Sequence, residues 1–129
     1  MTTNDKPNNQ TIPFPKKEAV VLFETEATNC GHLIGIMTLN EPKSLNALSV
    51  GMCQLLSRQL EAWQTDTQIV AIILKGAGEK AFCAGGDIRK LYDSMSATAP
   101  VPNPYATEFF GNEYRLYRQM HFYPKTLIL

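Results

Sequence analysis

Residues 80–92, KAFCAGGDIRKLY, hold the strongest local signal in this sequence. Gly85 and Gly86 come directly before Asp87, and the next apolar residues fall at helical spacing: Ile88, Leu91, Tyr92 and Met95. The pattern predicts a tight turn that leads into a helix. Asp87 suits the N-cap, because its carboxylate can accept a hydrogen bond from the amide of Lys90. Amides at such a turn can bind a phosphate, a carboxylate or an oxygen that becomes negative during a reaction.

A Gly-Gly-Asp turn is also a common way to enter a helix, so its spacing alone leaves a purely structural interpretation open. Its place in the chain favours function. Residues 69–74, IVAIIL, predict a strand buried on both faces, and residues 32–39 and 49–66 predict a strand and an amphipathic helix before it. Strand, helix and strand in this order indicate a parallel α/β layer. The turn would then follow a central strand at its carboxyl end, where open α/β sheets bind ligands.

The remaining elements surround this unit. Residues 20–25 predict a strand that pairs with 32–39 as a hairpin, and residues 107–122 predict a helix rich in aromatic residues. Trp63, on the helix predicted at 49–66, is expected to lie in the hydrophobic core. Residues 96–106 carry three prolines and indicate a mobile connector, either a lid or a plain surface loop. Residues 125–129 begin another strand, so we expect the 129-residue chain to be the first part of a longer protein.

Composition narrows the function classes. Lys plus Arg and Asp plus Glu both number 12, and this balance argues against a nucleic-acid partner. No apolar run is long enough to cross a membrane. Residues 1–18 are polar and predict a disordered tail before a single domain at 19–129. This tail lacks arginine and contains Asp5, so it is a poor mitochondrial presequence. The three cysteines are irregularly spaced, which favours reduced thiols. We therefore expect a cytoplasmic location.

Other chemistry has weaker support. Gly76, Gly78 and Ala81 formally satisfy a relaxed dinucleotide fingerprint, but no helical pattern begins at Gly78. Cys83 follows Phe82 and is more typical of a small buried side chain than of a nucleophile. The two histidines stand in no visible catalytic or metal-binding arrangement, so we assign neither a role and expect no metal site.

These stretches resemble the crotonase, or enoyl-CoA hydratase/isomerase, superfamily. The similarity rests on KAFCAGGDIRKLY, on NEPKSLNAL at 40–48 and on IILKGAG at 72–78, and runs from about Val20 to Leu129. The stretch FFGNEYRLYRQMHFYPK at 109–125 is similar to the 3-hydroxyisobutyryl-CoA hydrolase branch. The resemblance implies an α/β fold, the N-terminal part of a spiral of ββα units.

The resemblance also implies a site for an acyl-CoA thioester. Gly86 would supply the first of two backbone amides that polarise the thioester carbonyl, and Glu113 would contact a hydroxyl of the acyl group. Lys43 would lie near phosphate and, with Ser44 and Leu45, would line the pantetheine channel. The other expected substrate-binding residues surround the turn, with Ala84 near the adenine end of coenzyme A: Ala84, Gly85, Asp87 and Ile88. Coenzyme A enters as part of the substrate, with no separate cofactor.

The expected activity is thioester hydrolysis in valine degradation. A hydratase or isomerase, and a CoA-binding module without catalysis, remain alternatives. Glu41 stands where the family often has arginine, and Thr126 where proline is usual. The chain stops before the segments that would carry the second amide and the catalytic carboxylates, so we expect it to be inactive alone, to need the remainder of the same protein and to be capable of homo-oligomer formation.

Overall fold

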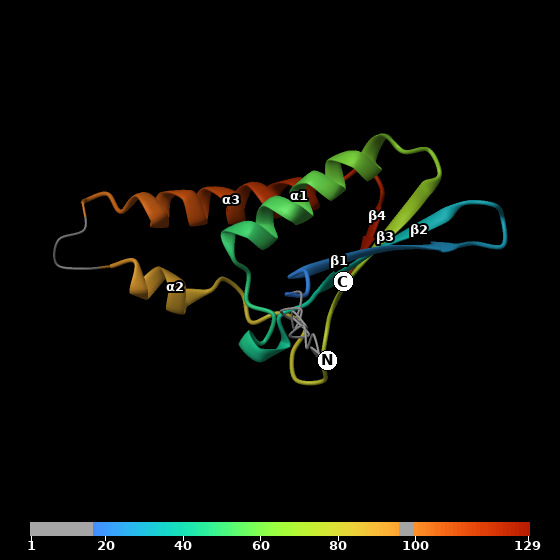
Figure 1. Ribbon diagram of the computed structural model, residues 1–129. Helices are drawn as coiled ribbons and strands as arrows, with labels where there is room; N and C mark the ends of the chain where they lie inside the picture. The colour runs from blue at the N-terminus through green and yellow to red at the C-terminus, as the bar shows by residue number, and fades with distance from the viewer. Residues whose placement is uncertain (1–16, 96–99) are drawn as a thin grey trace, which may run out of the picture.

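A computed structural model describes residues 17–95 and 100–129 of the chain. Its strands β1 to β4 form one sheet in sequential order, with β1 and β2 antiparallel and the other two pairings parallel: Val21–Ala27, Leu33–Leu39, Ile69–Gly76 and Thr126–Ile128. The helical elements are the short 3₁₀ helix η1 and α1 to α3: Pro42–Ser44, Val50–Thr65, Ile88–Asp93 and Pro104–His121. The predicted hairpin and parallel layer are both confirmed, and the α/β class with them (Figure 1).

The main core lies between the sheet and helix α1, with α3 packed alongside α1 (Figure 1). The predicted apolar face of α1 is buried, and Trp63 at its end belongs to the core as expected. The Trp63 ring meets the Phe23 ring edge to face at 6.2 Å between centroids. It also lies directly over Gly35 of β2, where a Cβ atom would come within 2.6 Å of the ring. A glycine at this position therefore lets the helix approach the sheet closely.

Strand β3 buries one face rather than the two that its six apolar residues predicted. Ile69, Ile72 and Leu74 are buried, whereas Val70 is 43% exposed. The pairing with β2 skips Val70, which is the extra residue of a β-bulge. The bulge shifts the alternation of side chains along the strand by one residue. Ile69 before the bulge and Ile72 after it therefore both lie on the buried face. An uninterrupted apolar run therefore did not require burial on both sides.

Polar side chains connect α1 to helix α3 and to the residues just after α3. Ser57 Oγ donates to Gln119 Oε1 at 2.7 Å, while Gln119 Nε2 donates back to the Ser57 carbonyl at 3.1 Å. The Tyr123 hydroxyl donates to the Leu60 carbonyl at 2.7 Å. Lys125 Nζ binds the carbonyls of Trp63 and Asp66 at the end of α1. The two Lys125 contacts bind carbonyls at the end of α1, where a helix leaves them without partners.

Helix α3 begins three residues before its predicted start. Asn103 caps it, since its side-chain oxygen accepts from the amide of Tyr105 at 3.0 Å, and Pro104 occupies the first turn. Residues 104–106 are therefore helical and do not belong to a connector or lid. The rest of that prediction falls partly on residues 96–99, outside the described residues, as does the predicted tail over residues 1–16.

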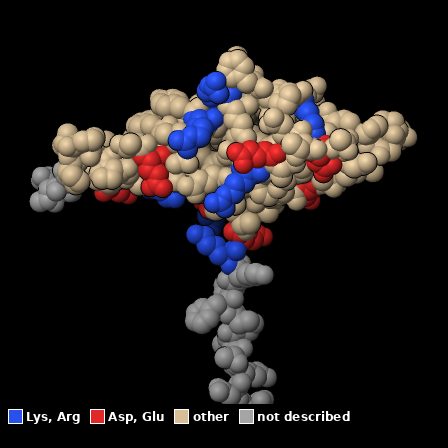
Figure 2. Space-filling view, turned by 90° about the horizontal axis from the view of Figure 1, so that it is seen from above, with Lys and Arg blue, Asp and Glu red and all other residues tan. Residues whose placement is uncertain are grey.

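The helix-covered side of the molecule carries both signs of charge, with Lys and Arg interspersed among Asp and Glu (Figure 2). Such a surface lacks the single-sign patch that nucleic-acid binding needs. Within residues 17–95 and 100–129, no helix combines the length and apolarity that a bilayer crossing requires.

The close approach at Gly35 makes a prediction about stability. Gly35→Ala should lower the free energy of unfolding by about 1–3 kcal/mol, because the new methyl group overlaps the Trp63 ring. Gly111→Ala is the matched control, since Gly111 lies within α3 with open space around it and should gain roughly 0.5–1 kcal/mol. Urea denaturation of both variants measures the two changes. A Gly35→Ala protein as stable as wild type would contradict the packing described.

Candidate functional site

The Gly-Gly-Asp turn has the local structure that its sequence predicts. Gly85 has φ +86°, a left-handed conformation that suits glycine. Asp87 caps helix α2, with Oδ1 accepting from the amide of Lys90 at 3.2 Å. A second carboxylate oxygen lies 3.8 Å from Lys90 Nζ. The side chain of Asp87 is therefore engaged in holding the turn.

The loop between β2 and α1 docks onto this turn through backbone hydrogen bonds. The Leu48 amide donates to the Gly85 carbonyl at 2.7 Å, and the Asp87 amide donates to the Leu48 carbonyl at 2.8 Å. The Ala84 amide donates to the Leu45 carbonyl at 3.0 Å. Among the hydrogen bonds of the described residues, the Gly86 amide donates none. The docking thus uses the Gly85 carbonyl and the Asp87 amide, on either side of Gly86, and leaves the Gly86 amide available.

An open cavity of about 440 Å³ lies between the loop and the turn. It brings together seven of the residues with predicted site roles: Lys43, Ser44, Leu45, Ala84, Gly86, Asp87 and Ile88. Ala47 and Arg89 also line it, and sequence reasoning missed both. Lys43 and Arg89 give the cavity two cations, whereas its one carboxylate, that of Asp87, already has partners. The cavity therefore suits a ligand that is in part anionic and in part apolar.

Gly85 and Glu113 lie outside this lining. Gly85 borders a separate apolar cavity of about 310 Å³. Glu113 is only 6% exposed, and its Oε1 accepts a hydrogen bond from the Tyr117 hydroxyl at 2.9 Å. A Cβ atom on Gly86 would lie 2.9 Å from Glu113 Oε1 and 2.6 Å from Phe109 Cζ. The carboxylate thus lies directly behind Gly86, and Glu113 is a buried residue.

Asn46 holds the loop in place, and sequence reasoning gave it no role. Its side chain is fully buried, with Nδ2 donating to the carbonyls of Ala77 and Ala81 at 2.9 and 3.0 Å. Its Oδ1 accepts from the Glu41 amide at 3.0 Å. Its backbone has φ 55°, a conformation that asparagine tolerates better than most residues. That preference was the available sequence signal.

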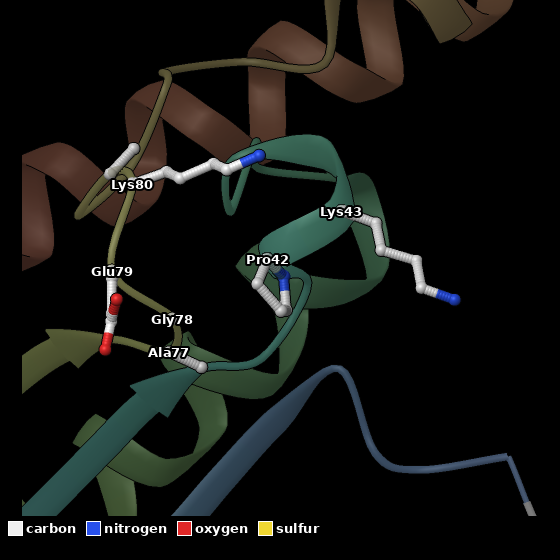
Figure 3. Close-up of a pocket in the computed structure, with 7 residues that line it drawn as sticks. Pro42, Lys43, Ala77, Gly78, Glu79 and Lys80 are labelled. Carbon is white, nitrogen blue, oxygen red and sulfur yellow. The ribbon is translucent and has the colours of Figure 1, made fainter.

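A third cavity, of about 390 Å³, lies between η1 and residues 77–81 (Figure 3). Lys43 borders it but extends away from it, whereas Lys80 extends toward η1. Gly78 has φ +81° and lies so close to Pro42 that a Cβ atom would be 2.9 Å away. No helix begins there, since the next one is α2. Gly76 ends β3 and Gly78 forms a turn, so the dinucleotide-binding alternative is wrong.

Three comparisons with known proteins support the fold. The family model described as Enoyl-CoA hydratase/isomerase matches residues 34–129. A solved carnitinyl-CoA dehydratase from Mycobacterium thermoresistibile superposes with a TM-score of 0.72 and 36% identity, over 85% of this chain and 30% of its own. The 3-hydroxyisobutyryl-CoA hydrolase, mitochondrial, of Gallus gallus is 50% identical over 64% of this chain, and that of Xenopus tropicalis 44% identical over 73%.

The chain belongs to the enoyl-CoA hydratase/isomerase family. The predicted superfamily and its N-terminal fold are thereby confirmed. The chain spans only 20% and 23% of the length of these two hydrolases.

The predicted cytoplasmic location is wrong by the same comparison, because both hydrolases are named as mitochondrial. The prediction rested on the composition of residues 1–18, which lack arginine and contain Asp5. Composition of one short segment reports only whether that segment can form a basic amphipathic presequence. The relatives carry the stronger evidence.

Sequence reasoning missed one cluster of side chains in this chain. At the turn between β1 and β2, Cys30 Sγ lies 3.2 Å from Thr28 Oγ1 and 3.6 Å from His32 Nδ1. The pKa of the Cys30 thiol falls to about 7 because of the hydrogen bond from Thr28 and then that from His32. Burial instead raises the pKa of Cys53 to about 11, with the charge of Glu113 as a second cause. The hairpin turn lies at the opposite end of the molecule from α2 (Figure 1).

The hydrogen bonds of Asn46 predict a large effect from a nearly isosteric change. Asn46→Asp should cost about 3 kcal/mol of stability, because two donors become acceptors that face two carbonyls in a buried place. Asn29→Asp makes the same change at the exposed hairpin turn and should stay within about 0.5 kcal/mol of wild type. Denaturant midpoints compare the two. An Asn46→Asp protein that matches Asn29→Asp would show that the tie is dispensable.

The thiol pKa values predict selective alkylation. Cys30 should react with iodoacetamide at pH 7.5 and its rate should level off above pH 8, because its thiolate is then fully formed. Cys53 should stay unmodified in the folded protein, since its thiol remains protonated and buried. Thr28→Val should move the half-maximal rate of Cys30 to higher pH. Peptide mass spectrometry follows each cysteine separately, and equal rates for both would refute the difference.

Proposed function

We propose that this chain forms part of an acyl-CoA thioester hydrolase, a 3-hydroxyisobutyryl-CoA hydrolase that acts in valine degradation in mitochondria. The observation that carries the proposal is the Gly86 amide: it donates no hydrogen bond among the described residues, and Gly86 lines the cavity between the loop and the turn. The hydrolases to which the chain is 50% and 44% identical carry this activity and location in their names.

The chemistry of a thioester suits such an amide. Attack on the carbonyl carbon moves negative charge onto the carbonyl oxygen. An amide that is already fixed stabilises that charge without reorganising. The turn fixes Gly86 from both sides, through the hydrogen bonds between Leu48 and its two neighbours, Gly85 and Asp87. Gly86 thus acts as one oxyanion donor, and the second donor would come from the remainder of the protein.

Coenzyme A fits the cavity by its mixed character. Its phosphates would bind near Lys43 and Arg89, the two cations of the lining. Its pantetheine arm would contact Leu45 and Ile88, whose side chains are 42% and 74% exposed. The Ala84 amide already donates to the Leu45 carbonyl. The Ala84 carbonyl remains to accept a hydrogen bond from the adenine amino group. Ser44 contributes to the same wall.

Glu113 would recognise the acyl group. It lies behind Gly86, so an oxygen held by the Gly86 amide would place the neighbouring acyl carbons close to the carboxylate. A buried carboxylate rewards a ligand that donates a hydroxyl to it and disfavours one that cannot. This position favours a 3-hydroxyacyl group over the plain enoyl group of a hydratase.

A CoA-binding module without catalysis is the second candidate. It is favoured by one observation: among the described residues, the only carboxylate that lines the 440 Å³ cavity is that of Asp87, which caps α2 and pairs with Lys90. Hydrolysis needs a positioned acid or base. A thioesterase assay on this chain and on a version extended to the length of the relatives separates the two, with hydrolysis expected only from the extended protein. Size-exclusion chromatography of both tests the expected homo-oligomer.

The oxyanion role of Gly86 is tested by a change that removes its N–H. In the extended protein, Gly86→Pro should lower kcat by about 10²–10³, the usual loss for one oxyanion donor. In this chain, the infrared carbonyl stretch of bound ¹³C-labelled 3-hydroxyisobutyryl-CoA should shift to lower frequency with wild type but not with Gly86→Pro.

Gly86→Ala is the control for crowding, because it keeps the N–H and adds only a methyl group that meets Phe109 and Glu113 Oε1. It should retain the infrared shift even where its affinity falls. A Gly86→Pro protein with the full infrared shift and unchanged kcat would remove Gly86 from the mechanism.

A further inference from the structure

We propose that Tyr117 is a positioning residue that fixes one oxygen of Glu113 and leaves the other for the substrate, so that Tyr117 sets the preference for hydroxylated acyl groups. The inference rests on the proposed function and deepens it. No role for Tyr117 follows from the family resemblance or from its place in the sequence, where it is one of several aromatic residues on α3.

The two side chains form a pair along one helix. Tyr117 follows Glu113 by four residues on α3, which places them one turn apart. The Tyr117 hydroxyl donates to Glu113 Oε1 at 2.9 Å. That same oxygen is the one that a Cβ atom on Gly86 would approach to 2.9 Å. The hydroxyl therefore holds the carboxylate at a defined place against the proposed oxyanion donor.

The second carboxylate oxygen remains available. Among the described residues, Glu113 Oε2 takes part in no hydrogen bond, yet no fully enclosed side-chain oxygen lacks a partner. Oε2 must therefore keep some contact with solvent although Glu113 as a whole is only 6% exposed. A carboxylate with one oxygen fixed and one oxygen accessible can accept a hydrogen bond from a ligand hydroxyl with little reorganisation.

The phenol is suited to a donor that never changes state. Partial burial raises the pKa of Tyr117, and the hydrogen bond to Glu113 raises it further. The hydroxyl group therefore stays protonated across the working pH range. Its ring lines the apolar cavity beyond Gly85, together with Leu116 and Met120. Replacement by phenylalanine keeps this wall and removes only the hydrogen bond.

The test compares two ligands that differ by one hydroxyl group, 3-hydroxyisobutyryl-CoA and isobutyryl-CoA, by calorimetric titration of this chain. Wild type should bind the hydroxylated ligand more tightly. Tyr117→Phe should lower that preference about tenfold while leaving the affinity for isobutyryl-CoA unchanged, since one charge-assisted hydrogen bond no longer fixes the carboxylate. Tyr114→Phe is the matched control, because Tyr114 lies on the same helix, is 62% exposed and has no bond to Glu113.

The outcomes separate this inference from the proposed function. Equal losses for both ligands in Tyr117→Phe would assign Tyr117 a merely structural role and overturn the inference. A preference that survives in Tyr117→Phe but disappears in Glu113→Gln would do the same and leave the proposed function standing. A wild-type chain that binds neither acyl-CoA ligand would overturn both.

A second measurement needs no ligand. The ultraviolet titration of the tyrosines, taken as the difference between wild type and Tyr117→Phe, isolates Tyr117. In a Glu113→Gln background this difference titration should move to lower pH, because the carboxylate no longer opposes loss of the phenol proton. An unmoved titration would show that the pair does not form in solution and would overturn the inference.

Discussion

The buried side chain of Asn46 is the constraint on which the rest of the site depends. The chain after β2 and the chain after β3 leave the same edge of the sheet, as the parallel pairing of these strands requires. Asn46 joins them, because one amide group binds the carbonyls of Ala77 and Ala81 and the amide of Glu41. An aliphatic side chain of similar size would leave these groups unsatisfied in a place that water does not reach.

This tie explains how an amide comes to be free on the cavity wall. With the loop anchored at Asn46, its next residues run alongside the Gly-Gly turn and pair with it at Leu48. In this pairing Leu48 binds the residues on either side of Gly86, so the Asp87 amide donates to Leu48 and the Gly86 amide does not. The Gly86 amide is available because Leu48 pairs opposite Gly86. No sequence motif predicts this register.

Local patterns predicted the elements well, and long-range contacts marked their limit. Asp87, the α1 face and the parallel layer followed from spacing and capping preferences that act within a few residues. The bulge at Val70, the role of Asn46 and the Cys30–His32 contact depend on partners that only the folded chain brings together. The turn at 85–87 followed from spacing and the other site residues from resemblance, and the cavity gathers most of them.

The burial of Glu113 had a sequence signal that the aromatic residues of α3 obscured. Phe109, Glu113 and Leu116 follow the spacing of one helix face, and all three are buried, whereas Phe110, Tyr114 and Tyr117 are exposed. An acid within an apolar helical stripe is therefore more informative than an acid beside one. The same packing bears on Gly86, because Phe109 and Glu113 leave no room for a side chain there. Glycine at 86 would be required for packing alone, so its identity is not evidence for catalysis. The evidence is the Gly86 amide, which donates no hydrogen bond among the described residues. Close packing against α3 does not require that amide to lack a partner.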